Sequence, residues 1–348
     1  MAHPEDHEPD EEREQELQGA GERLPAALNR VARLGCHACT IPPAVHRSVR
    51  LRDAAPDRNP QPVSGLVAVC GSISADMFGY APRLPRPGES VLGDRFLLAP
   101  GGKGANVAVA AARLGARVRF FGAHGDDQFG AFIGGALRHE GVDVTSLAVI
   151  AGMHSGVALI AVDAQGENQI LALPGANGLV GAPDACGAAV WFCPGEVPRA
   201  AHEGTIAAAR ADGATAIVNP SPANAIDPDV VAMFDIAIVN ETELHTFAGH
   251  LPARVVLTRG AAGAVLLPRG TELAAMPAHA VDTTGAGDAF AGAVCAGIAS
   301  GAPLEQAVQL ALVTAAISVE REGCQPSYAR RDEVAARAGA AGIDVRLP

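Results

Sequence analysis

Residues 280–290 read AVDTTGAGDAF and place a carboxylate beside a turn with almost no side chains. Gly285, Ala286 and Gly287 lead into Asp288, where an alanine-rich segment of helical length begins. Small residues at a helix start let an anion approach the free backbone N–H groups, where the helix dipole is positive. Asp288 would repel that anion, but a carboxylate there suits removal of a proton from a hydroxyl that attacks phosphorus. The stretch therefore indicates phosphoryl transfer, with a plain helix cap and an acidic first turn as the simpler alternative.

Short apolar runs alternate with alanine-rich segments of helical length through most of the chain. Such runs are typical of strands buried in a parallel sheet, with crossover helices between them. We therefore expect an α/β fold that binds its ligands at the carboxyl ends of the strands. The predicted strands are 65–71, 117–122, 188–193, 214–219, 236–239 and 255–258, and the predicted helices are 105–114, 286–300 and 304–319.

A second glycine-rich turn, GGKGAN at 101–106, follows a predicted strand at 90–98. It cannot be a phosphate-binding P-loop, because Gly104 follows Lys103 where that motif needs Ser or Thr. Lys103 is the only lysine in a chain with 26 Lys and Arg residues, and a compact ammonium between glycines suits a polar ligand. Asn106 lies three residues later, so both side chains can point from one face of the first helical turn.

Two β-rich runs at 156–162 and 168–173 are joined by DAQGE, which predicts a hairpin with a glycine turn. Together with the strand at 90–98, these runs would form a small antiparallel sheet beside the main one.

Composition restricts the functions that are open to this chain. Its 348 residues, 49% of them hydrophobic, can bury the core of one large α/β domain. The net charge of −12 and the lack of a basic patch argue against a nucleic-acid surface. No apolar run is long enough to span a membrane, and the acidic N-terminus is unlike a signal peptide. We therefore expect a soluble cytoplasmic protein that binds neither nucleic acid nor membranes.

The first 63 residues are polar, charged and punctuated by proline, and we expect them to form a disordered extension ahead of one domain at 64–340. The seven cysteines are odd in number and scattered, which fits reduced thiols in a cytosolic protein. Cys36 and Cys39 form a CxxC with His46 nearby. No second pair follows, so a zinc or redox site is the less favoured interpretation.

Taken together, these stretches resemble the PfkB family of carbohydrate kinases, the ribokinase-like kinases. DTTGAGDAF at 282–290 is similar to the family's second signature, and PGGKGANVAVAAARL at 100–114 to its first. The resemblance runs from about residue 66 to about residue 334, with the motifs in the family's order. It is strongest to the branch that phosphorylates ribose, through GSISAD at 71–76, GDD at 125–127, GVALI at 156–160, GEN at 166–168, PGAN at 174–177, NPSPA at 219–223, NETE at 240–243 and GCQPS at 323–327.

This resemblance implies a three-layer Rossmann-like α/β sandwich with a mostly parallel central sheet, plus a small antiparallel β lid from about 88–100 and 155–174. It implies an ATP-dependent kinase that phosphorylates the 5-hydroxyl of D-ribose, giving ribose 5-phosphate and ADP. Mg²⁺ and K⁺ would be its cofactors, and the lid would pair two subunits in a homodimer. Asp288 would be the base, and the N–H groups of Gly285, Ala286 and Gly287 would stabilise the transferring phosphoryl group.

The resemblance alone gives roles to further residues. The simpler interpretations of these residues are turn caps and pairing with helix dipoles. The sugar would be held by Ser74, Asp76, Gly102, Lys103, Asn106, Glu167 and Asp288. The nucleotide would meet Asn219, Thr258, Arg259, Gly260 and Gly287. Potassium would be enclosed by Asp282, Thr284, Ser318, Arg321, Gly323 and Ser327, and magnesium would be held through water by Asn240 and Glu243.

Two departures from the family pattern leave questions open. Ser74 stands where the ribose kinases usually carry Asn, so another pentose, a ketohexose, a keto-deoxy acid or a nucleoside stays possible as the acceptor. Only AGHLPA separates Phe247 from Arg254, where the family has another helix, so we expect a thinly covered sheet face and lower stability there. A non-catalytic sugar sensor is the alternative from another class, and it is disfavoured because the base and the glycines are present.

Overall fold

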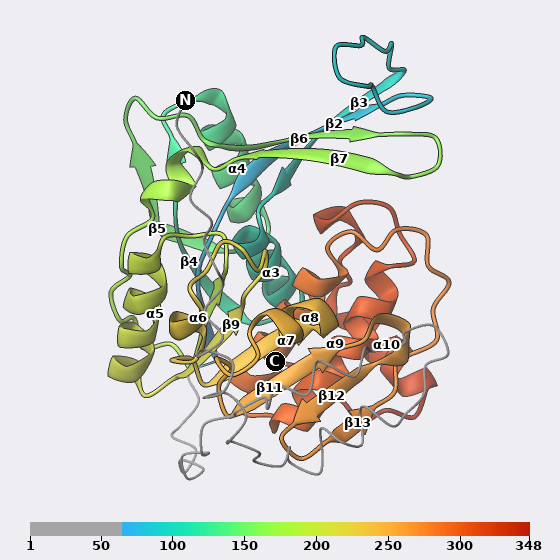
Figure 1. The fold of residues 1–348 in the computed structure, drawn as a ribbon. Helices are drawn as coiled ribbons and strands as arrows, with labels where there is room; N and C mark the ends of the chain where they lie inside the picture. Colours follow the sequence, from blue (N-terminus) through green and yellow to red (C-terminus); the bar gives the residue numbers. More distant parts are fainter. Residues whose placement is uncertain (1–64) are drawn as a thin grey trace, which may run out of the picture.

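The structure, a computed structural model, describes residues 65–348 and contains two β-sheets (Figure 1). The larger sheet has nine strands in the order β13-β12-β11-β10-β9-β8-β1-β4-β5. Its neighbouring strands pair parallel except at one edge, where β12 runs antiparallel to both β11 and β13. The strands are β1 (Leu66–Cys70), β4 (Arg117–Gly125), β5 (Asp143–Ile150), β8 (Val190–Pro194), β9 (Thr215–Asn219), β10 (Ile236–Asn240), β11 (Arg254–Thr258), β12 (Ala264–Leu267) and β13 (Thr271–Leu273).

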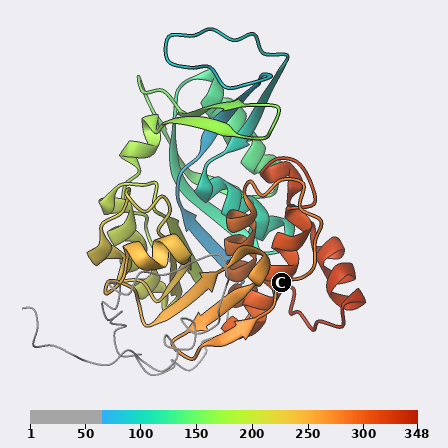
Figure 2. The same ribbon diagram turned by 45° about the vertical axis from the view of Figure 1, so that its right-hand side comes forward.

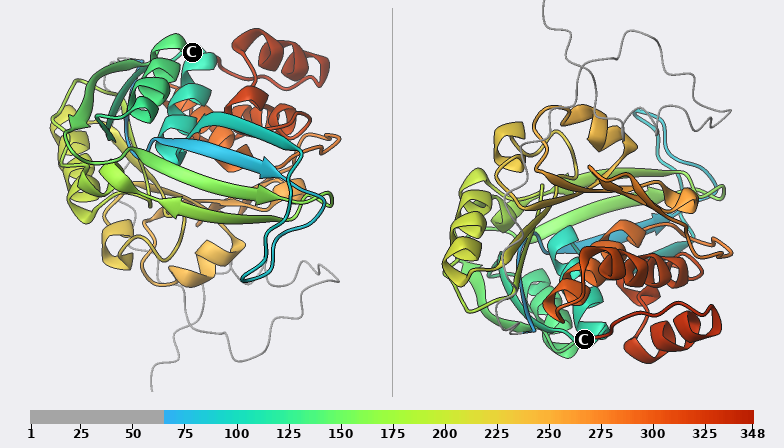
Figure 3. Two further views of the ribbon diagram at one scale, coloured as in Figure 1. Left: turned by 90° about the horizontal axis from the view of Figure 1, so that it is seen from above. Right: turned by 90° about the horizontal axis from the view of Figure 1, so that it is seen from below.

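Helices cover both faces of this sheet and give it the predicted three layers (Figures 2 and 3). Successive side chains of a strand point to opposite faces, so Val67 enters one core and Ala68 the other. The first core lies under α3 (Lys103–Arg113), α4 (Gln128–His139), α8 (Ala286–Ala299), α9 (Leu304–Ser318) and α10 (Arg331–Ala340). The second lies under α5 (Arg199–Asp212), α6 (Pro228–Val231) and α7 (Glu241–Thr246). The predicted α/β sandwich is therefore confirmed.

The smaller sheet projects from the carboxyl end of the larger one and is ordered β3-β2-β6-β7 (Figure 1). We call it the lid; its strands are β2 (Ser74–Tyr80), β3 (Arg95–Gly101), β6 (Gly156–Val162) and β7 (Asn168–Leu173). The predicted hairpin is confirmed as β6 and β7, whereas the strand predicted at 90–98 lies later, at β3. β2 was not predicted, and it pairs parallel with β6, so only the two outer pairs are antiparallel.

The segment between α7 and β11 contains no helix, as its sequence predicts. The expected thin cover is nevertheless wrong for the β11 side chains on this face, because Val255 and Leu257 are fully buried. Phe247 and Leu251 from the segment itself are buried in the same cluster and fill the place of a helix. Lower stability of this edge stays a prediction.

Two further expectations concern the whole molecule. No helix within residues 65–348 combines the length and apolarity that crossing a membrane requires. The cysteines in this part of the chain, Cys70, Cys186, Cys193, Cys295 and Cys324, are free thiols. The predicted extension at 1–63 and the Cys36/Cys39 pair lie outside the described residues.

Candidate active site

The predicted base lies in the first turn of α8. Gly285, the N-cap of this helix, has a φ of 74°, a left-handed conformation that glycine adopts without strain, so the chain turns sharply into the helix. Asp288 follows three residues later and is only 8% exposed. Its Oδ2 accepts a hydrogen bond of 2.9 Å from Asn106 Nδ2, which joins α8 to α3. The structure thus brings two of the predicted site residues into direct contact.

The Asn106 amide is held at both ends. Gln325 Nε2 donates to Asn106 Oδ1 at 2.9 Å, which orients the amide so that its nitrogen faces Asp288. Gln325 is itself fixed by its backbone, since Arg113 Nη1 donates to the Gln325 carbonyl at 2.6 Å and to the Tyr328 carbonyl at 2.9 Å. Gln325 is not among the residues predicted from the sequence. It lies within the GCQPS motif, but nothing in the sequence pairs it with Asn106.

The charges around Asp288 favour a reactive carboxylate. Burial raises its pKa above the ordinary value and Glu196 adds to the rise, while Lys103 and the Asn106 hydrogen bond oppose it. The pKa of Lys103 is raised chiefly by the facing Asp288, against the effect of burial, so its ammonium is charged at neutral pH. A buried carboxylate with a raised pKa beside a fixed cation suits a general base.

Asp76 extends the site onto the lid. Ser74, the residue that departs from the family pattern, donates its hydroxyl hydrogen to Asp76 Oδ1 at 2.6 Å. The serine hydroxyl is therefore hydrogen-bonded to this carboxylate. Burial raises the pKa of Asp76 to about 6, with smaller contributions from Glu196 and Asp288 and an opposing one from Ser74. Gly101 on the paired strand leaves room for this carboxylate, because an added Cβ would lie 2.0 Å from Asp76 Oδ2 and the Asp76 side chain would have to move.

Glu196, which the sequence analysis also missed, lies between these groups. It follows β8, the strand next to β1, and accepts a hydrogen bond from Ser72 Oγ. Its Oε2 is also 3.4 Å from the backbone nitrogen of Lys103, the first residue of α3. A glutamate just after a buried strand is a usable sequence signal, but no spacing within the chain links Glu196 to the glycine-rich turn.

Two residues of the segment at 324–328 contact the turn before α8. Tyr328 Oη donates to the Gly285 carbonyl at 3.1 Å, and a Cβ at Gly285 would lie 2.2 Å from Cys324 Sγ. Burial raises the pKa of the Cys324 thiol, which therefore acts as a neutral packing group. The first N–H groups of a helix have no partner within it. At α8 these belong to the residues at 286–288. The Ala286 nitrogen donates to the Thr283 carbonyl at 3.2 Å, so the N–H groups of Gly287 and Asp288 are the ones that support the predicted anion-binding turn.

Of the residues predicted on the nucleotide side, Asn219 ends β9 and Thr258 ends β11, with β10 between these strands, whereas Gly287 lies in α8. Asn219 Nδ2 donates to the Ile238 carbonyl at 2.9 Å, and Thr258 Oγ1 donates to the Val239 carbonyl at 3.2 Å. Both side chains therefore tie neighbouring strands together. Their predicted contact with a nucleotide stays a prediction.

Asn240 and Glu243 form the capping box of α7, whereas the simpler interpretation considered for NETE was pairing of its glutamates with the helix dipole. Asn240 Oδ1 accepts from the Glu243 nitrogen at 2.8 Å, and Glu243 Oε2 accepts from the Asn240 nitrogen at 3.0 Å. At the end of β11, Arg259 is less well satisfied. Its buried Nε has no partner among the described residues, and its Nη2 lies 3.8 Å from Glu272 Oε1.

The predicted potassium ligands come from two loops that the structure ties together. The nitrogens of Val281 and Asp282 donate to the Val319 carbonyl at 2.7 and 3.2 Å, and the Gly323 nitrogen donates to Asp282 Oδ2 at 2.8 Å. Within residues 65–348 no group of three or more His, Cys, Asp or Glu side chains could hold a metal ion. A cation here would depend on carbonyl and hydroxyl oxygens, such as those of Thr284, Ser318, Arg321 and Ser327.

Glu167 is the predicted sugar contact that the structure leaves apart. It is exposed in the turn between β6 and β7, at the end of the hairpin far from the main sheet (Figure 1). Ala172 lies level with Asp76 across the lid, and Glu167 is five residues from it, or about 17 Å along a strand. A role in sugar binding therefore stays a prediction.

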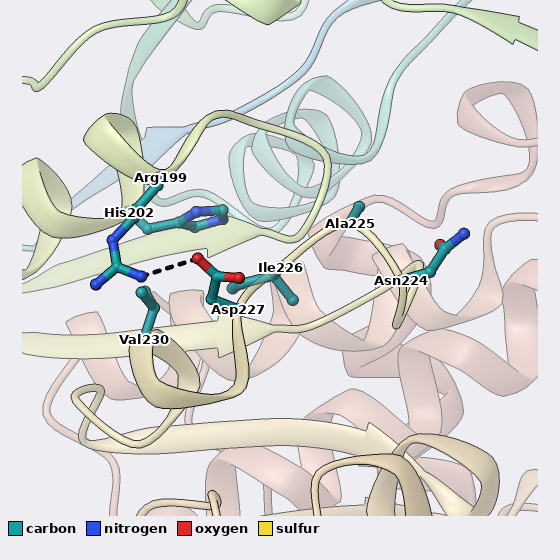
Figure 4. Close-up of a pocket in the computed structure, with 7 residues that line it drawn as sticks. All are labelled: Arg199, His202, Asn224, Ala225, Ile226, Asp227 and Val230. Atoms are coloured by element: carbon teal, nitrogen blue, oxygen red, sulfur yellow. Dashed lines mark hydrogen bonds and ion pairs between the residues drawn. The ribbon is translucent and has the colours of Figure 1, made fainter. Parts of the chain in front are cut away.

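A small cavity of about 140 Å³ lies on the α5 side of the main sheet (Figure 4). Arg199 and Asp227 form an ion pair of 2.8 Å along it, and His202 lies beside them. Burial lowers the pKa of His202, so the ring is neutral at pH 7 and its Nε2–H donates to the Pro194 carbonyl at 2.9 Å. None of the predicted site residues lines this cavity, and the chemistry lies elsewhere.

The chain is similar to a protein family, to individual relatives and to solved structures. The family model described as pfkB family carbohydrate kinase matches residues 64–331. The ribokinase of Haemophilus influenzae is 32% identical, over 77% of this chain and 96% of its own length. The deoxyribokinase of Salmonella typhimurium is 32% identical as well, over 75% of this chain and 95% of its own. The solved structure of Arabidopsis thaliana ribokinase complexed with ribose and ATP has a TM-score of 0.72 and 26% identity, covering 78% of this chain and 97% of that one.

These likenesses cover the α/β sandwich, the lid and both glycine-rich turns. The chemistry of Asp288 and its neighbours agrees with them, because a buried base beside an anion-binding turn is what phosphoryl transfer to an alcohol requires. The chain therefore belongs to the PfkB family of carbohydrate kinases and is a phosphotransferase with an alcohol group as acceptor.

Proposed function

We propose that this enzyme is an ATP-dependent D-ribose kinase, which transfers the γ-phosphoryl group of ATP to the 5-hydroxyl of the sugar. The observation that carries the proposal is the buried Asp288, bonded to Asn106 and facing Lys103 directly behind the Gly285 turn. The similarity to a ribokinase and to a ribose- and ATP-bound structure supports the choice of acceptor.

In this mechanism Asp288 accepts the proton of the 5-hydroxyl as the sugar oxygen forms a bond to the γ-phosphorus. The bond from that phosphorus to the β–γ bridging oxygen breaks, so that ADP leaves and ribose 5-phosphate remains. N–H groups of the turn at 285–287 stabilise the charge on the transferring phosphoryl group, where most of the catalytic effect of such enzymes arises. Lid closure would exclude water, which would otherwise compete as the acceptor.

The sugar would lie between the lid and α3. Ser74, Asp76, Gly102, Lys103 and Asn106 would orient it, with Glu167 joining only when the lid closes. On the lid face that carries Asp76, the residues level with it on the neighbouring strands are Ala99, Ala158 and Ala172. These small side chains leave room for a ligand beside the carboxylate.

The predicted cations fit the residues present. Glu243 Oε1 makes no hydrogen bond to a described residue, so Asn240 and Glu243 keep an acceptor that could hold hydrated Mg²⁺. The tied loops of Asp282 and Gly323 supply oxygens for K⁺. When bound, Mg²⁺ neutralises charge on the phosphates and K⁺ adds a fixed positive charge near the Gly285 turn.

On the nucleotide side, Asn219, Thr258, Arg259, Gly260 and Gly287 would contact ATP. The orphaned Nε of Arg259 supports a phosphate partner, because a buried guanidinium nitrogen without an acceptor is costly. We also propose that the enzyme acts in the cytoplasm, where its free thiols would stay reduced.

The lid also supports the proposed homodimer. Met77, Leu159 and Leu171 lie level with one another on the face opposite Asp76, and Phe96 extends the same face. Phe96 is 67% exposed and Leu171 57%, and an open hollow of about 510 Å³ lies along them. An exposed apolar face of this kind is typical of a protein–protein interface.

A second acceptor is supported by two observations. The deoxyribokinase of Salmonella typhimurium matches this chain as well as ribokinases do, and Ser74 replaces the usual Asn beside the sugar-binding aspartate. 2-Deoxyribose is therefore the first alternative, ahead of ketohexoses, keto-deoxy acids and nucleosides. A sensor without activity is disfavoured by the intact base.

The test is phosphate transfer from ATP to a panel of ribose, 2-deoxyribose, fructose and nucleosides, with and without potassium. We expect the highest kcat/KM for ribose and stimulation by K⁺. Preference for another acceptor would move the substrate and leave the mechanism in place. No transfer to any acceptor would contradict the proposal.

A further inference from the structure

The helix that carries Lys103 and Asn106 begins without a cap of its own. Its N-cap residue, Gly102, has no side chain, and its first turn contains no acidic residue. Gly102 cannot be replaced by a capping residue, because its φ is 91° and an added Cβ would lie 2.7 Å from Ile73 Cα. The first N–H groups of a helix need partners from elsewhere when the helix start is buried.

Two residues on neighbouring strands supply those partners. The Lys103 nitrogen lies 3.4 Å from Glu196 Oε2, and the Gly104 nitrogen lies 3.5 Å from Ser72 Oγ. The Ala105 nitrogen donates to the Ser72 carbonyl at 3.0 Å. Ser72 Oγ donates a hydrogen bond to Glu196 Oε2, so the serine and the carboxylate act as one unit. The first three N–H groups of α3 are thereby satisfied from outside the helix.

The backbone that carries Glu196 is held in place. His202 Nε2 donates to the Pro194 carbonyl at 2.9 Å, and the Gly195 nitrogen donates to the Asn219 carbonyl at 3.0 Å. Gly195 packs against Ser221 so closely that an added Cβ would lie 2.9 Å from its carbonyl oxygen. A carboxylate at the positive end of a helix dipole is also stabilising in itself.

We propose that Glu196 is a positioning residue for sugar binding, which caps α3 together with Ser72 and so fixes Lys103 and Asn106. The proposal rests on the proposed sugar kinase activity for its kinetic consequence. Gly102, Lys103 and Asn106 all lie at the start of α3, whereas the proposed nucleotide contacts lie at the ends of β9 and β11 and at Gly287 on α8. Loss of the cap should therefore weaken sugar binding selectively.

The kinetic test compares Glu196→Ala with Glu196→Gln, whose amide oxygen still accepts from the Lys103 nitrogen. We expect Glu196→Ala to raise KM for ribose about tenfold while KM for ATP stays within about twofold, the size of effect that loss of a helix cap produces. Glu196→Gln should recover most of the loss. Glu203→Gln, an exposed position on α5 paired with Arg199, is the control and should match the wild type.

A second measurement keeps the proposal testable if the acceptor is not ribose. Hydrogen exchange of the ligand-free enzyme should be faster in Glu196→Ala at residues 103–106, and unchanged in α8. If KM for ribose and KM for ATP rise together, or if exchange at 103–106 does not change, Glu196 is not the cap that we infer. Wild-type enzyme inactive on every sugar would overturn the proposed function, while the exchange result would still decide the role of Glu196.

Discussion

The two sheets of this enzyme differ in how far their apolar side chains are buried. Every residue of β8, in the middle of the main sheet, is buried, whereas every residue of β7, at the edge of the lid, is exposed. Yet β7 carries Ile170, Leu171 and Leu173 in only six residues. Helices of the same chain cover both faces of the main sheet, whereas the edge strand β7 of the lid is left uncovered.

The difference separates two kinds of functional group. Around the end of the main sheet, Asp288, Asn106 and Gln325 are buried and bonded to one another before any ligand arrives. On the lid, only Asp76 and Ser74 at its root have such contacts. The groups proposed for the chemistry are therefore preorganised in the main body, whereas the surfaces proposed for ligand and partner lie on the lid. The predictions below test this division.

The largest effect should come from the preorganised part. Asp288→Asn removes the base but keeps an acceptor oxygen for Asn106, so the site should stay folded. We expect kcat to fall by about a thousandfold, within the range that general-base catalysis contributes, with sugar binding changed by less than about threefold. Turnover and equilibrium binding of ribose measure the two effects. A variant that keeps most of its turnover would remove Asp288 from the mechanism.

Much of this region was predictable from the sequence, because its signals are local. Small residues in the turn at 285–288 and in the glycine-rich turn at 101–106 each predict the start of a helix. Continuous apolar runs predict the parallel strands. Glu196 and Gln325 were missed for a physical reason: their partners, Lys103 and Asn106, are distant in the sequence. Only the strand order brings Glu196 to α3, and only the packing of the GCQPS segment brings Gln325 to Asn106.

The next effect concerns Asp76, at the junction of the two sheets. Its pKa of about 6 means that the carboxylate is protonated as the pH falls through that value. If the ionised form holds the sugar, KM for ribose should rise below pH 6 in the wild type. Asp76→Asn should raise KM about thirty-fold at pH 8, as loss of a charged hydrogen bond does, and should flatten this pH dependence. Steady-state kinetics from pH 5 to pH 8 measure both.

The same substitution should stabilise the protein. The folded-state pKa of Asp76 lies above its ordinary value of 3.8, so ionisation costs folding free energy, fully above about pH 6 and not at all below pH 3.8. Asp76→Asn should therefore raise the free energy of unfolding at pH 8 by about 1–3 kcal/mol. The gain should shrink as the pH falls from 6 to 4. Denaturant unfolding of both proteins at pH 8 and pH 4.5 provides the comparison, and equal stability at pH 8 would contradict it.

A smaller effect is expected from the residue that orients Asn106. Gln325→Met keeps the buried volume but removes the donor to Asn106 Oδ1, so the amide is free to rotate away from Asp288. We expect kcat to fall about tenfold with KM for ATP unchanged, which corresponds to one hydrogen bond. Thermal unfolding serves as the control for packing. A fall in stability without a fall in kcat would make Gln325 a purely structural residue.

The lid was harder to predict than the main body. Its hairpin was found because the alternation and the glycine turn are local, but β2 was missed since it carries the mixed sequence SADMFGY directly after a buried strand. The parallel pairing of β2 with β6 is a contact between distant segments, and it decides which lid residues share a face with Asp76.

The smallest kinetic effect should come from two adjacent lid residues, and it tests the division between main body and lid most sharply. Ile170 and Leu171 are 60% and 57% exposed, but they point to opposite faces of β7. Ile170 lies level with Phe78, on the face of Asp76, and Leu171 lies level with Met77, on the face proposed for the dimer. The substitutions Ile170→Glu and Leu171→Glu introduce the same charge at adjacent positions, so each serves as the control for the other. Different outcomes are predicted for the two.

Ile170→Glu should raise KM for ribose about threefold and leave the oligomeric state unchanged, because it places a charge where the lid approaches the sugar. Leu171→Glu should convert the proposed dimer to monomers, since an unpaired charge is costly in a buried apolar interface. Sedimentation velocity measures the second effect and steady-state kinetics the first. If both variants remain dimeric, or if Ile170→Glu is the one that dissociates, the two faces have been assigned wrongly, and the lid would not divide its work between ligand and partner in the way that its strand pairing implies.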